Sequence, residues 1–265
     1  MHPIINIAIR AARSGGNILL RNADRIDTLT VTTKRRNDYV SEVDRAAEQA
    51  IIDVLHRSYP DHGFLAEESG LRKGNEFQWV IDPLDGTTNY LHGFPQYSVS
   101  IALKHRGVVE HGVVYDPLRE ELFTASRGSG SQMNDRRIRV SEQKTLDHAL
   151  LGTGFPFRDQ SHLDAYLEMF KSLIRDTAGI RRPGSAALDL AYVAAGRLDG
   201  FWELGLSEWD FAAGVLLIKE AGGVVSDIAG GDNFLKNGNL VAGNLKLHAA
   251  MLKAIRPHLT EQLRA

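Results

Sequence analysis

The chain has 265 residues, of which 43% are hydrophobic, and its formal net charge is −2. Such a chain is typical of a globular protein with one large domain or two packed lobes, long enough to bury a sizeable core. The near-neutral charge does not indicate wholesale nucleic-acid binding, and the absence of cysteine excludes disulfides, thiolate metal sites and a cysteine nucleophile.

The first half of the chain begins with helical patterns. In residues 1–20, charged residues interrupt the apolar ones at helical intervals, which predicts an amphipathic helix and not a signal peptide. A second helix is predicted over 43–55, with Pro60 just beyond its end. No stretch approaches the roughly 18 uncharged apolar residues that a membrane span needs, and with no cysteine we expect a cytoplasmic protein.

Strand patterns follow and then alternate with helices. A buried strand is predicted over 77–82, and several strands over 97–128, with turns near Arg106 and at Asp116. In the second half we expect helices around 163–174, over 185–196 with Ser185 as a possible cap, and over 208–223, and strands over 198–204, 224–228 and 240–243. Strands grouped in sheets, with helices between and outside them, predict a layered α/β protein.

Residues 79–90 read WVIDPLDGTTNY, in which two aspartates stand three positions apart. Asp-Pro and Asp-Gly are good turn formers, so the pair alone would indicate a turn. A phosphate-transfer site needs oxygen ligands for Mg²⁺, backbone N–H groups for the phosphate, and a hydroxyl that positions water. Asp82, the Leu84 carbonyl, Asp85 and the Gly-Thr-Thr turn supply all three. An Asp-x-Asp-Gly-Thr phosphatase pattern does not fit, because the acids lie too far apart and a proline intervenes.

The same stretch resembles the first signature of the inositol monophosphatase family. A second signature is matched by 208–223, with Asp210 near a helix start, and a third match is FLAEESG, which contains Glu67. Over essentially the whole chain these motifs resemble the bacterial SuhB branch of that family. The resemblance implies an αβαβα sandwich in a single domain of two lobes, roughly 1–145 and 146–265, with Mg²⁺ between them.

The resemblance also implies a metal site of two or three Mg²⁺ ions. Glu67, Asp82, the Leu84 carbonyl and Asp85 would hold the first ion. Asp82, Asp85 and Asp210 would hold the second. Because several carboxylates that meet at one point repel one another, we expect the site to need cations.

Catalytic roles are implied for Thr87, Asp44 and Glu67. Thr87 matches the hydroxyl that positions the attacking water, and Asp44 matches the acid that hydrogen-bonds this threonine. Ser41 stands where the family usually has threonine, and its hydroxyl preserves the function. Lys34 lies near the lysine of the family's mobile loop, although the loop differs in length here.

A substrate pocket is implied as well, in which Gly86 and Thr87 donate to the phosphate and Glu203 bonds a sugar hydroxyl. The alternative for Glu203, a surface acid at a strand end, stays open. The expected substrate-binding residues are Leu84, Asp85, Gly86, Thr87, Arg181, Gly184, Ser185, Ala186, Glu203 and Asp210.

The resemblance therefore implies a Mg²⁺-dependent, Li⁺-sensitive phosphomonoesterase for inositol monophosphate and similar polyol phosphates, in a homodimer. A fructose-bisphosphatase or a nucleotide 3′-phosphatase is the alternative within the same superfamily. A second role is implied by the SuhB branch, whose members act in ribosomal RNA transcription antitermination. In that role the chain would bind NusA and RNA polymerase in an RNA-containing complex, with Arg181 and Arg182 as the candidate surface.

Overall fold

The computed structural model describes residues 3–28, 31–35, 38–156 and 159–264, without the side chains of 26–28, 31, 33–35 and 38–40. The helices are α1 (Pro3–Asn22), η1 (Ala23–Thr28), α2 (Glu42–Ser58), α3 (Thr87–Leu91), α4 (Leu163–Ile174), α5 (Ala186–Ala194), α6 (Glu208–Glu220), α7 (Phe234–Asn237), α8 (Leu245–Ile255), η2 (Arg256–His258) and α9 (Glu261–Arg264).

The strands form three sheets. A two-stranded sheet pairs β1 (Val31–Arg35) with β2 (Asp38–Ser41). The eight-stranded sheet has, in spatial order, β10 (Arg136–Arg137), β9 (Gly130–Met133), β8 (Glu121–Ser126), β7 (Val108–Asp116), β6 (Ser98–His105), β5 (Phe77–Asp85), β3 (Gly63–Ala66) and β4 (Gly70–Arg72). The five-stranded sheet has β12 (Gly179–Arg181), β11 (Leu150–Thr153), β13 (Gly200–Glu203), β15 (Leu240–Gly243) and β14 (Val224–Ser226).

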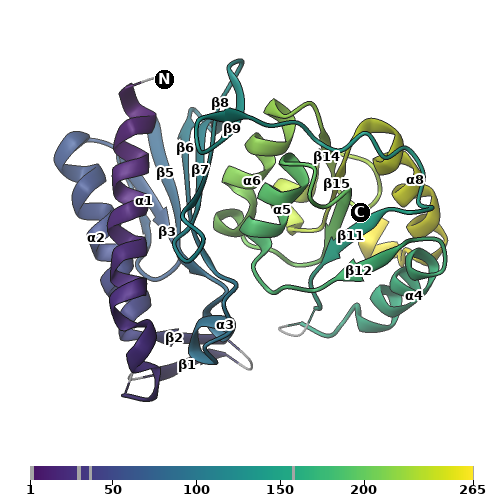
Figure 1. Cartoon of the computed structure of the whole chain (residues 1–265), viewed down its shortest axis with the longest axis horizontal. Coiled ribbons are helices and arrows are strands. Elements are labelled where there is room, and N and C mark those ends of the chain that lie inside the picture. The colour runs from purple at the N-terminus through teal and green to yellow at the C-terminus, as the bar shows by residue number, and fades with distance from the viewer. Residues whose placement is uncertain (1–2, 29–30, 36–37, 157–158, 265) are drawn as a thin grey trace.

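These elements stack in five layers (Figure 1). Helices α1 and α2 cover the outer face of the eight-stranded sheet, and α5 and α6 pack between the two large sheets. Helices α4 and α8 cover the far side of the five-stranded sheet. The predicted αβαβα layering is confirmed. Among the described residues, no helix is long and apolar enough to cross a bilayer.

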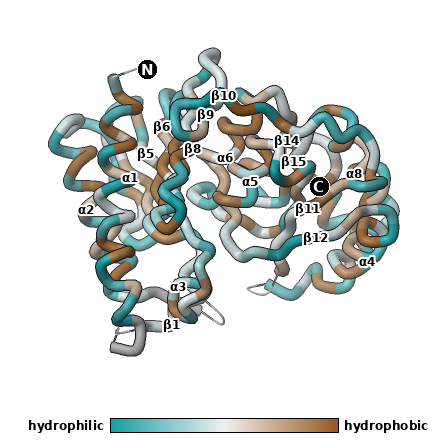
Figure 2. The backbone as a smooth tube through the Cα atoms, in the orientation of Figure 1, coloured by the Kyte–Doolittle hydropathy of each residue, from teal (hydrophilic) through white to brown (hydrophobic). Residues whose placement is uncertain are grey.

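The hydrophobic core is divided among the interfaces of these layers. One cluster joins α1 and α2 to the large sheet, a second surrounds α5 and α6, and a third lies under α4 and α8. Helix α6 is apolar around its whole circumference, because a sheet covers each of its two sides (Figure 2). The central helices are therefore held rigidly, and their N-termini are well placed to carry functional groups.

Strand β5 differs from its prediction in a way that shapes the site. The strand does not stop at Asp82 but continues to Asp85, and its register against β6 shifts between them. Asp82 pairs with Ser100 and Asp85 with Ser98, so β5 has one residue more than its partner over this interval. Side chains three apart on a regular strand point to opposite faces. The bulge around Pro83, which has no N–H to donate, brings both aspartates to the same side.

Candidate active site

The turn after β3 is held in place by a buried acid of α2. Glu48 is 3% exposed, and its two carboxylate oxygens accept the N–H groups of Glu68 and Ser69, both at 2.8 Å. Glu67 donates its own N–H to the Ile81 carbonyl at 3.1 Å. The turn is thereby tied both to α2 and to β5, and Glu67 lines the same cavity as Asp82.

Three aspartates from distant parts of the chain meet in this cavity. Asp82, Asp85 and Asp210 each offer a carboxylate oxygen, and these oxygens all lie within 4.8 Å of one another. Asp210 belongs to the first turn of α6, where one of its oxygens accepts the Ser207 N–H at 2.7 Å. The three side chains are only 2–8% exposed. Their chemistry and spacing fit a binding site for a hard cation.

Burial makes the charged forms of these acids unfavourable. Burial is the largest cause that raises the pKa of Asp82 well above its ordinary value, and the charge of Glu67 adds to it. Burial also raises the pKa of Asp85 to about 6, against hydrogen bonds from Ser185 and Ala187 that lower it. A cation at the cluster would offset both the desolvation and the mutual repulsion.

Asp85 also connects the cluster of three aspartates to the start of helix α5. Its Oδ2 accepts the Ser185 hydroxyl at 2.5 Å and the Ala187 N–H at 2.8 Å. Ser185 occupies the N-cap position of α5, as predicted, but its hydroxyl makes no capping bond to the helix. The cap is instead supplied by Asp85, from the neighbouring sheet.

Thr87 lies next to the acid cluster, at the start of α3. Its hydroxyl oxygen is 3.2 Å from Asp44 Oδ1 and 3.1 Å from the Leu84 carbonyl, so its single proton has two acceptors. The other oxygen of Asp44 accepts the N–H and the hydroxyl of Ser41, which fixes its direction. Burial raises the pKa of Asp44. Gly86, which precedes Thr87, has a φ of 101°, a conformation that favours glycine.

The cavity has a volume of about 610 Å³ and receives most of the predicted site residues. Those that line it are Glu67, Asp82, Leu84, Asp85, Gly86, Thr87, Gly184, Ser185, Ala186, Glu203 and Asp210. Asp44 does not line the cavity but contacts Thr87, which does. Arg181 is not among the lining residues; it is exposed, and its Nη1 donates to the Ile180 carbonyl at 3.3 Å. The side chain of Lys34 lies outside the described residues.

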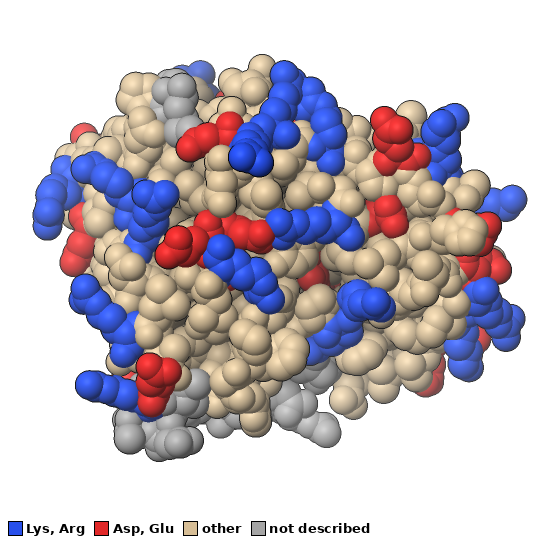
Figure 3. All heavy atoms as spheres, viewed as in Figure 1, with Lys and Arg blue, Asp and Glu red and all other residues tan. Residues whose placement is uncertain are grey.

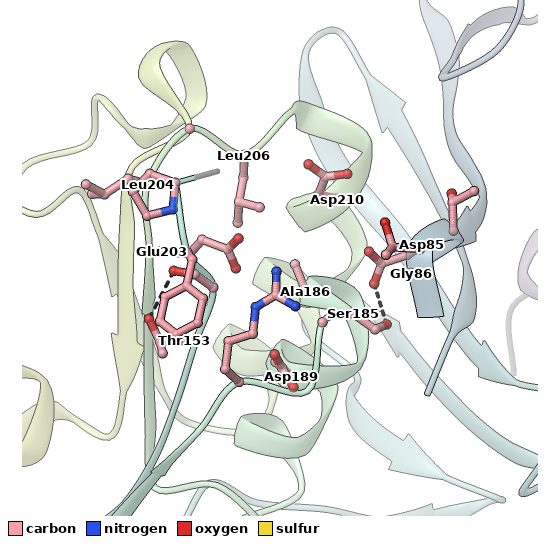
Figure 4. A pocket seen from close by; sticks show the side chains of 18 of the residues that line it. Asp85, Gly86, Thr153, Ser185, Ala186, Asp189, Glu203, Leu204, Leu206 and Asp210 are labelled. Atoms are coloured by element: carbon pink, nitrogen blue, oxygen red, sulfur yellow. Dashed lines mark hydrogen bonds between the residues drawn. The ribbon is translucent and has the colours of Figure 1, made fainter. Parts of the chain in front are cut away.

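Glu203 faces the cavity from the end of β13 (Figure 4). A Cβ atom at Gly154 would stand 1.9 Å from Glu203 Oε1, so a larger residue there would displace the Glu203 carboxylate from its position. Arg182, which we expected on a partner-binding surface beside the pocket, is exposed and also lines the cavity, with its guanidinium carbon 5.4 Å from the centre of the Phe155 ring. Arg182 is therefore not independent of the site.

Several cavity residues were absent from the sequence-based prediction, among them two with polar groups in the wall. Asp189 of α5 and Thr153 at the end of β11 both line it, and the Thr153 hydroxyl lies 2.8 Å from the Tyr166 hydroxyl. Asp189 is the only charged residue in the otherwise largely apolar stretch 185–196, and this isolation could have marked it as a candidate site residue. For Thr153 the sequence offers no such signal.

The layered fold and the buried acid cluster are together typical of metal-dependent phosphatases. The chain belongs to the inositol monophosphatase family, whose model matches residues 1–260. The predicted family is therefore confirmed. Membership in this family implies phosphatase activity and metal dependence.

Relatives with similar sequences cover the whole chain. The protein named Nus factor SuhB of Pseudomonas aeruginosa is 57% identical over 270 residues, all of both chains. The extragenic suppressor protein suhB of Bartonella henselae is 43% identical, with a TM-score of 0.95 over 97% of this chain and 100% of that one. The IMPase of Thermotoga maritima is 36% identical, with a TM-score of 0.88 over 98% of each chain. These matches confirm the similarity to SuhB proteins that the motifs indicated.

Proposed function

We propose that the protein is a Mg²⁺-dependent phosphomonoesterase that hydrolyses inositol monophosphate and related small polyol phosphates. The observation that carries the proposal is the convergence of Asp82, Asp85 and Asp210 beside Thr87 in one cavity. The family membership supports the same reaction, and the IMPases among the similar structures support the substrate class.

The residues present fit a hard divalent cation. Carboxylate and carbonyl oxygens are the ligands that Mg²⁺ prefers, and the cluster offers three buried carboxylates, with Glu67 and the Leu84 carbonyl beside them. Burial first, and then the charges of Glu67, Asp85 and Asp210, raise the pKa of Asp82, and a bound cation would offset both effects. We assign these five residues as the groups that would hold two or three Mg²⁺ ions.

When bound, Mg²⁺ would supply water activation and stabilise charge on the phosphate. The chain's own residues supply orientation. With Asp44 accepting the Thr87 proton, the oxygen of Thr87 keeps lone pairs that can accept a hydrogen bond from a water in the cavity. Glu67, on the same cavity wall, is the proposed acceptor for a proton that this water loses.

The phosphate and the alcohol would bind at different parts of the cavity. The N–H groups at the start of α3, from Gly86 and Thr87, have no partner within the helix and can donate to phosphate oxygens. Glu203, held in its space by Gly154, would accept a hydroxyl of the alcohol. Gly184 and Ala186 also line the cavity.

A panel of phosphate esters tests this proposal. We expect turnover of inositol 1-phosphate that requires Mg²⁺, is inhibited by Li⁺ and is poorly supported by Ca²⁺, whose coordination is less strictly octahedral. Fructose 1,6-bisphosphate and a nucleotide 3′-phosphate are the rival substrates. Undiminished hydrolysis in excess chelator would contradict the metal assignment, and preference for either rival would replace the substrate assignment.

A second role is proposed because relatives that match this chain over their full length are named Nus factor SuhB. We infer that the chain binds NusA and RNA polymerase in an RNA-containing antitermination complex, as a cytoplasmic homodimer. Pull-down from extract with and without ribonuclease tests it. Recovery of neither partner under either condition would remove this role.

A further inference from the structure

Asp189 is a buried carboxyl in the cavity wall to which the proposed reaction gives no task. It lies in α5, is 1% exposed, and lines the cavity together with Ala186 and Glu203. Its Oδ1 is buried and has no hydrogen-bond partner among the described residues. A buried carboxyl oxygen without a partner is costly, so its presence calls for a function.

The structural role of a helix cap does not explain Asp189. The first turn of α5 is already capped by Asp85, which accepts the Ala187 N–H. The backbone N–H of Asp189 donates to the Ser185 carbonyl in the ordinary helical manner, 3.0 Å away. The carboxyl group of Asp189 is thus left over after the helix has been satisfied.

The electrostatic surroundings of Asp189 are also unfavourable while the cavity holds no ligand. Burial raises its pKa well above the ordinary value, the charges of Glu203 and Asp85 raise it further, and Arg182 lowers it. A ligand group that donates a hydrogen bond would satisfy this carboxyl. A second anion would add to the repulsion.

In Figure 4, Glu203 lies on one side of the cavity and Asp85 on the other, and Asp189 lies on α5 between them. If the phosphate is bound at the Asp85 side, the alcohol extends toward the two carboxyls. Gly154 leaves the space that the Glu203 carboxylate occupies.

We propose that Asp189 accepts a hydrogen bond from a second hydroxyl of the alcohol moiety, beside the hydroxyl that Glu203 accepts. This inference rests on the proposed phosphatase function and narrows it. The favoured substrates are phosphate monoesters of polyols with at least two further hydroxyls. Simple aryl or alkyl phosphates leave Asp189 unpartnered.

The test compares Asp189→Ala and Asp189→Asn with wild type on two substrates, inositol 1-phosphate and p-nitrophenyl phosphate. Loss of a hydrogen bond to a charged group should lower kcat/KM for inositol 1-phosphate about 10- to 100-fold in Asp189→Ala. The value for p-nitrophenyl phosphate should stay within about threefold. Asp189→Asn, which keeps one acceptor oxygen, should recover part of the loss.

The control is Asp227→Asn, because Asp227 is a buried aspartate outside the cavity that accepts only backbone N–H groups in its own loop. It should leave the ratio between the two substrates unchanged. An equal fall for both substrates in folded Asp189→Ala, or no change for inositol 1-phosphate, overturns the proposal.

Failure of the phosphatase function itself would be visible separately, as wild type that hydrolyses neither ester with Mg²⁺. In that case calorimetric titration with inositol 1-phosphate decides the role of Asp189. Weaker binding to Asp189→Ala than to wild type supports it, and equal binding, or binding to neither protein, overturns it.

Discussion

Asp85 combines two tasks that are usually given to different residues. One of its oxygens caps α5 through Ser185 and Ala187, and its carboxylate is also part of the acid cluster with Asp82 and Asp210. The position of the cluster is therefore coupled to the position of the central helix. Because burial raises its pKa to about 6, the charge that Asp85 brings to the cluster is itself costly without a cation.

Asp85→Asn is expected to preserve the fold and to abolish turnover. The amide oxygen can still accept the Ala187 N–H, but one negative charge leaves the cluster. Turnover should fall by at least about 10³-fold, since the ion supplies both water activation and charge stabilisation. Mg²⁺ should also no longer raise the melting temperature.

Asp227→Asn makes the same chemical change outside the cavity. It should lower the melting temperature while Mg²⁺-dependent turnover per folded molecule stays normal. Near-normal turnover of folded Asp85→Asn would show that the acid cluster is not the active centre.

At the scale of elements, the contact between α5 and α6 is unusually close. A Cβ atom at Gly214 would lie 2.6 Å from the Cβ atom of Leu190, which is fully buried. Both helices are covered by sheets, so neither can move away easily. Gly214 thus sets the spacing of the layer that carries Asp210 and Ser185 into the site.

Gly214→Ala should destabilise the protein by about 1–3 kcal/mol, because extra volume in a packed core forces side chains off their rotamers. Leu190→Ala alone should cost about 2–5 kcal/mol through the cavity that it leaves. The double variant should be less destabilised than the sum, since each change makes room for the other. Urea unfolding of the three variants measures this, and strict additivity would show that the two residues do not press on each other.

His248 links α8 to β14 and makes stability depend on pH. Its Nε2 lies 2.8 Å from Ser226 Oγ, and burial lowers the pKa of the imidazole below 6.5. Below pH 6.5 the unfolded chain therefore binds a proton that the folded chain does not. The contribution of His248 to the free energy of unfolding should fall as the pH drops through this range.

We expect His248→Asn to lose less stability than wild type between about pH 7.5 and pH 5.5, as measured by urea unfolding. His148→Asn is the matched control, because the His148 side chain is 85% exposed. That control should keep the wild-type dependence. An unchanged dependence in His248→Asn would mean that another group sets it.

At the scale of the whole molecule, the charge distribution bears on the second proposed role. On the face seen in Figure 3, Lys and Arg side chains alternate with acidic ones and form no single continuous patch. This agrees with the net charge of −2 and favours a local contact over wholesale RNA binding. Arg181, exposed on an edge strand and absent from the cavity lining, is the better candidate than Arg182 for such a contact.

If catalysis and partner binding are separate, variants should divide them. Thr87→Ala should lower turnover at least about 10²-fold, by loss of the water-positioning hydroxyl, and retain binding to NusA and RNA polymerase. Arg181→Ala should weaken that binding and retain turnover.

Sedimentation of both variants reports whether the predicted homodimer is intact, so that an oligomeric change is not mistaken for a lost contact. Parallel loss of binding and turnover in both variants would show that the two roles are not separable.

Local sequence determined the identities of the elements and of most site residues. The helical periodicity over 43–55, the turns at Arg106 and Asp116, and the double glycine after α6 all correspond to features of the structure. These patterns are local, because spacing, capping and turn chemistry act within a few residues. The three site motifs were readable for the same reason, since each stands as a short contiguous stretch.

Only the tertiary structure decided which of these residues meet. The bulge in β5 depends on pairing with β6, and it alone explains how Asp82 and Asp85 come to face the same side. Both arginines are exposed, but Arg182 lines the cavity and Arg181 does not, because the path of the chain after β12 sets which of the two borders the site. Asp189 could be noticed in the sequence, but its unpartnered oxygen exists only because sheets and helices bury it from both sides. Burial and long-range pairing belong to the folded molecule as a whole, and no short stretch of sequence contains them.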